Sequence, residues 1–152
     1  ARVGPNSYDL TLAPELRVYT ERVLDSRRKN PTQRITISKG GYILNPGEGY
    51  LGCTVEWTAT YGFVPRINGV SSVGRLFVQV HQTAGEGEDG FEGRWTLEII
   101  ASAKPVVVYP GMRIAQLLYS PVVGISQPYR GRYQGQQGVE PSKSWQDFNT
   151  EE

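Results

Sequence analysis

The stretch W-T-L-E-I-I (Trp95–Ile100) decides how the rest of the chain is interpreted. Successive side chains of a β-strand point to opposite faces, so Trp95, Leu97 and Ile99 share one apolar face suited to burial. Glu98 lies on the other face, between a threonine and an isoleucine. A carboxylate in half-apolar surroundings is costly unless it is paired, protonated or functional. The stretch therefore predicts a strand with one buried face and a candidate general base on the other.

Outward from this strand, the chain contains many short apolar or alternating runs, each typical of a β-strand. Turns built on glycine or proline separate most of these runs, as at Asn45-Pro46-Gly47 and Asn68-Gly69. Many short strands at close spacing favour an antiparallel sandwich, jelly roll or barrel. The predicted strands are Tyr8–Leu12, Leu16–Tyr19, Arg34–Ile37, Tyr42–Leu44, Tyr50–Trp57, Phe63–Ile67, Phe77–His81, Thr96–Ile100, Val106–Tyr109 and Ile114–Tyr119.

One short helix and one exposed loop complete the predicted domain. Ser71 or Ser72 is a suitable N-cap for a helical turn that runs through Gly74 to Leu76. Residues 21–33 are polar and charged, which predicts a solvent-exposed loop.

The chain loses its apolar character from Gln127 onward, where glycine and glutamine are frequent. A disordered tail holds few aromatic residues, whereas this segment retains tyrosines, a tryptophan and a phenylalanine. We therefore expect residues 127–152 to form a tail that orders against a ligand or a neighbouring subunit. Residues 1–126 are expected to form one β domain.

Composition limits the classes of function. The 152 residues suit one ordinary domain, and 16 basic against 15 acidic residues give a net charge of +1. Such a balance provides no broad field for nucleic acid or an anionic membrane, and no apolar stretch is long enough to span a bilayer. The single cysteine, Cys53, excludes an internal disulfide and favours a reducing, cytoplasmic setting. Because the chain opens at Ala1 within structured-looking sequence, we expect further residues ahead of it.

Several catalytic classes are disfavoured by the residues that they require. A zinc deaminase or protease needs three or four His, Cys or carboxylate ligands in known spacings, but the chain has one His and one Cys. A Ser-His-Asp triad would have to use His81, which has no nucleophile elbow nearby. Neither a P-loop nor a dinucleotide-binding glycine motif opens a helix.

A hydroxyl pair and a cation lie close together after the Asn-Gly turn. Ser71 and Ser72 offer hydroxyls and free N–H groups to an anion, and Arg75 follows one turn later. An ordinary N-capped turn with a solvated arginine is the alternative. Glu98 likewise has alternatives to catalysis, namely an exposed position or an ion pair with an arginine such as Arg75.

The segment Thr83–Gly93 contains four glycines and four carboxylates. Gly85, Gly87 and their neighbours permit close backbone approach to a flat ligand, although a hairpin that needs glycine for its turns is equally consistent. The acidic side chains suit either a divalent cation or a solvated rim.

Six segments, in order along nearly the whole chain, resemble the dCTP deaminase family of the deaminase/dUTPase superfamily. The similar segments are Gly4–Leu12 (G-P-N-S-Y-D-L-T-L), Leu44–Glu56 (L-N-P-G-E-G-Y-L-G-C-T-V-E), Asn68–Arg75 (N-G-V-S-S-V-G-R), Val80–Glu98 (V-H-Q-T-A-G through G-F-E-G-R-W-T-L-E), Tyr109–Leu117 (Y-P-G-M-R-I-A-Q-L) and Tyr133–Ser142 (Y-Q-G-Q-Q-G-V-E-P-S).

The resemblance implies a mainly β, distorted jelly-roll or barrel subunit of the dUTPase-like type. It implies a homotrimer with nucleotide sites at subunit interfaces, in a bacterium, an archaeon or a virus. The implied reaction is zinc-free deamination of a deoxycytidine nucleotide, foremost dCTP, to the deoxyuridine nucleotide, as in dUTP biosynthesis. Magnesium would be carried by the triphosphate.

The resemblance also assigns the catalytic roles. Glu98 would take a proton from water and pass it toward the ring and the leaving ammonia. Ser71 and the Ala84 carbonyl would position that water, and Arg75 would orient Glu98.

The resemblance assigns the substrate-binding roles to other positions. The residues expected to touch the phosphates are Ser72, Tyr129, Arg132 and Gln136. The backbone of Thr83–Gly85 would read the edge of the base, and Glu88 stands where relatives carry an aspartate that contacts water or the 3′-hydroxyl.

Three positions depart from the family pattern and keep two other functions open. Val70 replaces an arginine, Glu86 adds negative charge near the phosphate path, and Glu88 replaces an aspartate. A dUTP diphosphatase is one alternative, although a plain dUTPase has no carboxylate at the position of Glu98. A catalytically inactive nucleotide-binding or regulatory homologue is the other.

Overall fold

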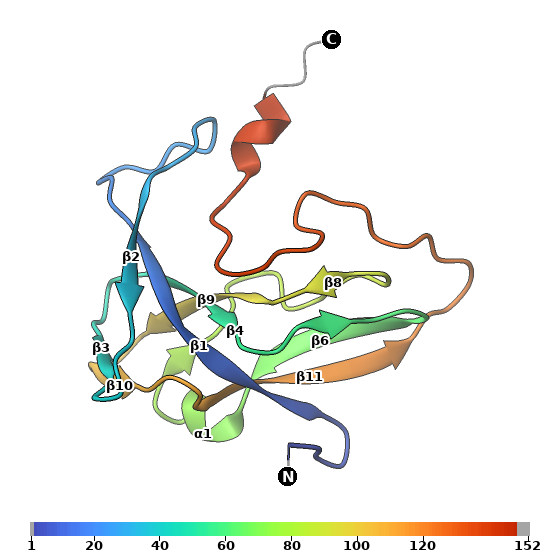
Figure 1. The fold of residues 1–152 in the computed structure, drawn as a ribbon, viewed down its shortest axis with the longest axis horizontal. Coiled ribbons are helices and arrows are strands. Elements are labelled where there is room, and N and C mark those ends of the chain that lie inside the picture. Colours follow the sequence, from blue (N-terminus) through green and yellow to red (C-terminus); the bar gives the residue numbers. More distant parts are fainter. Residues whose placement is uncertain (1, 149–152) are drawn as a thin grey trace.

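A computed structural model describes residues 2–148, and most of its regular structure is β-strand (Figure 1). A seven-stranded antiparallel sheet has the order β6-β11-β1-β4-β9-β7, with β2 paired to β1, and two-stranded sheets join β10 to β3 and β5 to β8. The elements are β1 (Tyr8–Tyr19), β2 (Thr32–Thr36), β3 (Tyr42–Leu44), β4 (Tyr50–Thr54), β5 (Thr58–Ala59), β6 (Phe63–Gly69), α1 (Ser71–Gly74), β7 (Val78–Gln79), β8 (Glu92–Gly93), β9 (Thr96–Ala101), β10 (Val106–Val108), β11 (Arg113–Pro121) and the 3₁₀ helix η1 (Ser144–Phe148).

Strand β1 runs through the middle of the large sheet and joins its two halves. It pairs with β11 along its first part and with β4 and β2 along its second part. The pairing with β4 slips between Leu12 and Leu16, where Pro14 has no N–H to donate and its carbonyl accepts a hydrogen bond of 2.8 Å from Ile37. The two strands predicted here are therefore one bent strand. The bend curls the sheet into the nearly closed, barrel-like form that the sequence predicted.

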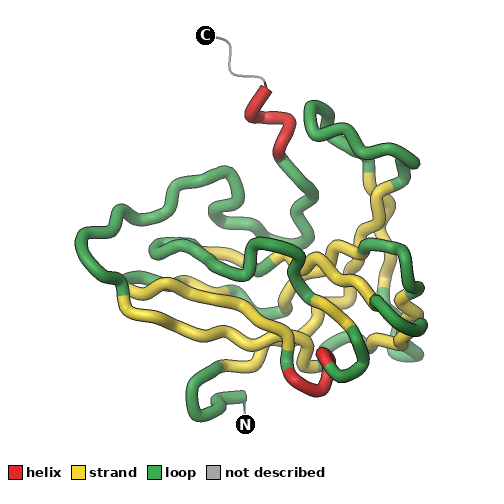
Figure 2. Tube along the Cα trace, turned by 180° about the vertical axis from the view of Figure 1, so that it is seen from behind, coloured by secondary structure: helices red, strands yellow, loops and turns green. Residues whose placement is uncertain are grey.

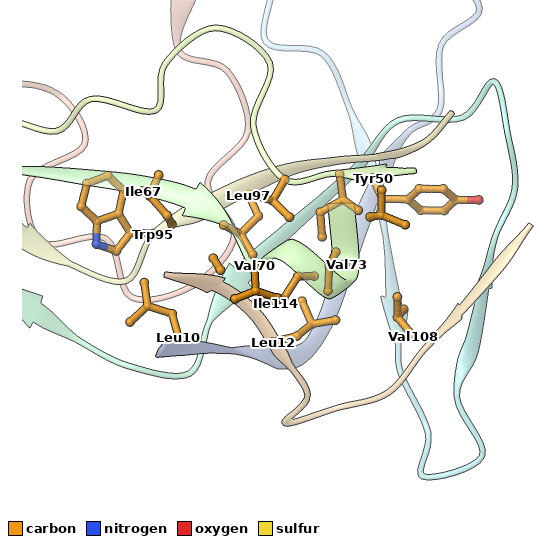
Figure 3. Close-up of a cluster of buried hydrophobic side chains, with 14 of the residues drawn as sticks. Leu10, Leu12, Tyr50, Ile67, Val70, Val73, Trp95, Leu97, Val108 and Ile114 are labelled. Atoms are coloured by element: carbon orange, nitrogen blue, oxygen red, sulfur yellow. The ribbon is translucent and has the colours of Figure 1, made fainter. Parts of the chain in front are cut away.

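The hydrophobic core lies inside this curled sheet (Figure 3). Leu10, Leu12, Leu97 and Ile114 are almost completely buried, and each contributes on the order of 1.5–3 kcal/mol relative to an exposed position. Strand β9 shows strict alternation of buried and half-buried residues, which confirms the predicted faces.

Several predicted boundaries were wrong. The strand predicted over Tyr50–Trp57 ends at Thr54, because the Thr54 hydroxyl donates to the carbonyl of Glu56 and turns the chain. Strands β5 and β8 are two residues each and carry no periodic pattern, so they were missed. The helix α1 lies where it was expected, but Val70 occupies its N-cap position and no side chain caps it. Ser71 and Ser72 therefore do not have the predicted capping role.

The exposed loop predicted over residues 21–33 is confirmed except at its end, where Thr32 and Gln33 join β2. No helix described within residues 2–148 combines the length and apolar character needed to cross a membrane.

The C-terminal segment is ordered by its own domain (Figures 1 and 2). The Tyr129 N–H donates to the Asp89 carbonyl at 2.7 Å, and the Arg94 N–H donates to the Gln136 carbonyl at 2.9 Å. The sequence predicted order against a ligand or a neighbouring subunit and did not include these contacts. The helix η1 was also missed, and the last predicted tail residues, 149–152, lie outside the described part of the chain.

Candidate functional site

A pocket of about 510 Å³ lies between the outer face of β9, the glycine-rich loop and the C-terminal segment. Aromatic and carboxylate side chains from these three regions form most of its wall. The lining residues are Tyr19, Leu51, Ala84, Glu86, Gly87, Glu88, Phe91, Trp95, Thr96, Glu98, Tyr129, Tyr133, Gln136, Glu140 and Ser142.

Glu98 reaches this pocket from the centre of β9. It pairs with Leu51 of β4, and its N–H donates to the carbonyl of Val80 at 3.0 Å. Burial raises the pKa of its carboxyl group, while the backbone of Gln82 and the charge of His81 act in the opposite direction. A half-buried carboxyl group with a raised pKa suits a general base that works near neutral pH.

Within residues 2–148, Glu98 makes no ion pair. The alternative in which Arg75 neutralises it is therefore not realised inside one chain.

The glycine-rich loop lies flat against the domain. The Gly85 carbonyl accepts the Ile67 N–H at 2.8 Å, and the Gly87 N–H donates to the Pro65 carbonyl at 2.7 Å. A Cβ atom on Gly87 would lie 2.4 Å from Cη2 of Trp95, a distance that real side chains do not reach. The close backbone approach inferred from the glycines is thus made to Trp95 and β6, which shapes the floor of the pocket.

The C-terminal segment closes the opposite wall. Tyr129 packs edge-on against Phe91 with ring centroids 6.0 Å apart, and its hydroxyl accepts the Tyr133 N–H at 3.2 Å. The Thr96 hydroxyl lies 3.5 Å from Oε1 of Gln136 and accepts the Glu140 N–H at 3.1 Å. The strand that holds Glu98 therefore also anchors the tail.

The structure brings about half of the predicted site residues together. The predicted residues that line the pocket are Glu98, Ala84, Glu88, Tyr129 and Gln136. Thr83 and Gly85 flank Ala84 in the loop without lining the pocket.

Arg132 is turned to another partner. Its Nη2 pairs with Asp147 and its Nη1 donates to the Lys143 carbonyl at 2.7 Å, so both terminal nitrogens of the guanidinium are used within the tail. The hydrogen bond to Asp147 is the main reason why the pKa of Arg132 is raised.

The hydroxyl pair and its arginine lie elsewhere. Ser71, Ser72 and Arg75 are exposed on and just after α1, at the end of the domain away from the tail in both Figure 1 and Figure 2. Val70 is buried in the core, so it offers nothing to a phosphate. The pocket and the helix α1 are separate in one chain.

Sequence reasoning missed several residues of the pocket wall. Trp95 was placed in the core only and Phe91 was given no role, although both face the pocket. Tyr19 arrives from β1, and its hydroxyl accepts the Ser142 N–H at 3.0 Å. The aromatic content of the tail was the one signal that pointed to this wall, and it did so for Tyr133.

The lining has an uneven chemistry. Among residues 2–148, four carboxylates line the pocket, from Glu86, Glu88, Glu98 and Glu140, and no lysine or arginine does. Aromatic walls and the Glu98 carboxyl group, whose pKa burial raises, suit a flat polar ring, whereas an anionic group needs cations from outside this wall. This combination describes a barrel-like β protein with an aromatic, carboxylate-lined pocket whose walls suit a flat ligand.

The comparison with known families is consistent with this class. The profile of the dCTP deaminase-like family matches residues 1–122. The chain belongs to the dCTP deaminase-like family.

Curated relatives cover almost the whole chain. It is 45% identical over 148 residues to the dUMP-forming dCTP deaminase of Clostridium acetobutylicum, a match of 97% of this chain and 85% of the relative. It is 46% identical over 147 residues to the dUMP-forming dCTP deaminase of Leptospira biflexa serovar Patoc, a match of 96% and 84%.

A solved structure supports the fold. The 2′-deoxycytidine 5′-triphosphate deaminase from Agrobacterium tumefaciens matches with a TM-score of 0.65 at 23% identity. The match covers 78% of this chain and 39% of that chain, so the longer protein shares this fold over part of its length.

Proposed function

We propose that the protein is a hydrolytic deaminase of dCTP that releases dUMP, ammonia and pyrophosphate. The observation that carries the proposal is Glu98, a half-buried carboxyl group with a raised pKa in an aromatic pocket of a dCTP deaminase-like chain. The relatives named above, at 45% and 46% identity, are dUMP-forming dCTP deaminases.

Glu98 would act on the water that attacks C4 of the cytosine ring. The carboxylate accepts a proton as the water oxygen bonds to C4, and it then returns the proton toward the ring and the departing amino group, which leaves as ammonia. Ala84 lines the same pocket, and its carbonyl would orient the water.

A second water would cleave the bond between the α- and β-phosphates, which balances the reaction as dCTP plus two waters giving dUMP, ammonia and pyrophosphate. The relatives' names favour dUMP as the product over the dUTP expected from the sequence. Glu88 and Glu86 line the pocket and are the carboxylates available to this step.

The complete site would be shared between copies of the chain, as in the homotrimer implied by the resemblance. The pocket wall supplies no lysine or arginine for a triphosphate, while Arg75 and the two serines are exposed and distant from it in the same chain. Leu76 and Phe77 beside them are 53% and 62% exposed, an apolar surface that a second copy would cover. We call the exposed surface formed by Ser71, Ser72, Arg75, Leu76 and Phe77 the α1 corner. The α1 corner of one copy would then complete the pocket of the next.

Magnesium would arrive with the triphosphate. Among residues 2–148 no three His, Cys, Asp or Glu side chains are grouped to hold an ion, so phosphate oxygens would supply most ligands. When bound, the ion would neutralise charge on the phosphates.

Zinc-free chemistry is supported by the donors of this chain. Cys53 is buried, and among residues 2–148 it is not grouped with other His, Cys, Asp or Glu side chains that could hold a metal ion.

One assay tests the proposal and its rivals. The purified protein is incubated with dCTP, dCMP and dUTP in the presence of magnesium, and ammonia, pyrophosphate and dUMP are followed. We expect all three products from dCTP and loss of ammonia in Glu98→Gln.

Other outcomes assign other functions. Pyrophosphate from dUTP with no ammonia from dCTP would make the protein a dUTP diphosphatase. Tight nucleotide binding without either product would make it an inactive regulatory homologue, which the replacement by Val70 and the acidic lining would then explain.

A further inference from the structure

Two cations of the C-terminal tail, Arg132 and Lys143, lie next to the pocket wall without being part of it. Arg132 precedes Tyr133 in the chain and Lys143 follows Ser142, and both of these neighbours line the pocket. The positive charge that the pocket lining lacks is therefore present one residue away from it, at two separate points of the tail.

The two cationic residues hold each other in place. Nη1 of Arg132 donates to the Lys143 carbonyl at 2.7 Å, and Nζ of Lys143 donates to the Arg132 carbonyl at 3.0 Å. The Tyr133 hydroxyl accepts the Lys143 N–H at 3.0 Å, and Nζ of Lys143 lies 5.4 Å from the centroid of the Tyr133 ring. Two like charges held side by side repel each other, so the pair is stable only with anions close by.

Carboxylates of the tail itself supply those anions. Nη2 of Arg132 pairs with Asp147, and Nζ of Lys143 lies 3.5 Å from Oε2 of Glu140. The side chains of Asp147 and Glu140 are 59% and 33% exposed. Solvent-exposed ion pairs contribute little to stability, so another anion can replace these carboxylates at small cost.

A chain of phosphates has the chemistry to replace both carboxylates. Phosphate oxygens accept the same charge-assisted hydrogen bonds from arginine and lysine as carboxylate oxygens do, and a triphosphate brings several such oxygens on one molecule. Glu140 lines the pocket, so the exchange at Lys143 would take place where the tail borders the ligand space.

We propose that Arg132 and Lys143 form a phosphate-binding pair of the tail, which Asp147 and Glu140 occupy as carboxylate substitutes until the triphosphate of the nucleotide displaces them. Asp147 then acts as a built-in competitor, because the affinity for the triphosphate falls with the fraction of molecules whose cations are already paired. The identity of the nucleotide rests on the proposed function, whereas the exchange of anions does not need deamination.

The test is isothermal titration calorimetry of the whole chain with inorganic tripolyphosphate. Asp147→Asn keeps the shape of the side chain and removes the competing charge, so it should bind tripolyphosphate about threefold more tightly than the wild type. Arg132→Gln and Lys143→Gln remove the charges that hold the phosphates, and each should bind about tenfold more weakly.

Matched variants control for the general effect of charge. Arg130→Gln removes an exposed arginine of the same tail that makes no ion pair within residues 2–148. Glu48→Gln removes an exposed carboxylate from the turn between β3 and β4, which likewise makes no ion pair in this range. Both should bind tripolyphosphate with the wild-type affinity.

A second titration separates a nucleotide from free polyphosphate. In a Glu98→Gln background, which should not turn over dCTP, the further change Asp147→Asn should tighten the binding of dCTP and leave that of deoxycytidine unchanged. Tighter binding of tripolyphosphate alone would overturn the assignment to the nucleotide.

The proposal is overturned if the wild type does not bind tripolyphosphate, if Asp147→Asn binds it no more tightly, or if Glu48→Gln tightens binding equally. Exchange at Asp147 without ammonia release from dCTP would leave this inference standing and refute the proposed function. Ammonia release by a chain whose phosphate affinity does not depend on Asp147 would do the reverse.

Discussion

The pocket around Glu98 and the α1 corner around Arg75 differ in how completely one chain builds them. The pocket is walled on three sides, and the tail that closes it is held by backbone hydrogen bonds to β8, Arg94 and the glycine-rich loop. The corner presents Ser71, Ser72 and Arg75 to solvent, beside exposed apolar side chains. One region has a carboxylate and aromatic walls but no cation, and the other has a cation and hydroxyls but no walls.

Under the proposed function, the two regions would be two halves of one site that is shared between copies of the chain. Phe77 at the corner adopts a positive φ of 60° while 62% exposed, an uncommon backbone conformation for a large residue. Such conformations persist where surrounding structure or function demands them. On this proposal, one chain would supply the whole pocket for a base, and a neighbouring copy would cover the exposed corner.

The largest expected effect comes from the pocket half. Glu98→Gln keeps the shape of the side chain and removes the base, so ammonia release from dCTP should fall about 10²–10⁴-fold. Glu21→Gln, in the exposed loop, should keep full activity. If Glu98→Gln released ammonia at the wild-type rate, Glu98 would not be the catalytic base.

The corner half should give the next largest effect. Arg75→Ala should lower kcat/KM about 100-fold with an unchanged melting temperature, because Arg75 is exposed and pairs with no carboxylate within residues 2–148. Arg28→Ala, an exposed arginine of the β1–β2 loop, is the control for kinetics. If Arg75→Ala lowered the melting temperature enough to explain the lost activity, Arg75 would have a structural role and not a role in the reaction.

A substitution that disturbs the packing beneath the pocket should lower the unfolding free energy. Gly87→Ala forces a Cβ atom against Trp95 and Pro65, which should cost about 1–3 kcal/mol of unfolding free energy. Gly49→Ala meets no atom within 4 Å and should be nearly neutral. Equal denaturation midpoints for both variants would show that the loop does not pack as described.

The smallest expected effect is the contribution of the Glu98 carboxyl group to the pH dependence of the unfolding free energy. Burial in the folded state raises the pKa of Glu98 above its ordinary value of 4.5, so the stabilising contribution of the protonated carboxyl group is fully present below that value and is lost as pH rises through the folded pKa. Glu98→Gln should therefore be more stable than the wild type at pH 8 and equally stable at pH 4. Urea denaturation at both pH values measures the difference in unfolding free energy between Glu98→Gln and the wild type. The difference between Arg75→Gln, which keeps Glu98, and the wild type should be the same at both pH values.

The sequence was sufficient to place Glu98 on the face of β9 opposite the core. It was insufficient to predict where the pocket lies relative to α1. Alternation in Trp95–Ile100 correctly placed Glu98 opposite the core, and the exposed loop and short helix followed from local composition. Strands β5 and β8 were missed because two-residue strands have no period. The wall formed by Tyr19 and the tail was missed because contacts such as Ser142 to Tyr19 join distant positions through backbone groups, which leave no sequence pattern. The separation of α1 from the pocket depends on the course of the whole sheet.

The most direct measurement of the shared site is complementation between two inactive variants. Glu98→Gln and Arg75→Ala are mixed, dissociated and reassembled, and ammonia release from dCTP is compared with each variant alone. If each site takes Glu98 from one copy and Arg75 from another, random assembly restores roughly a quarter of the wild-type activity. A mixture as inactive as its components, with mixed oligomers demonstrated by mass spectrometry, would contradict the account of two halves joined across copies.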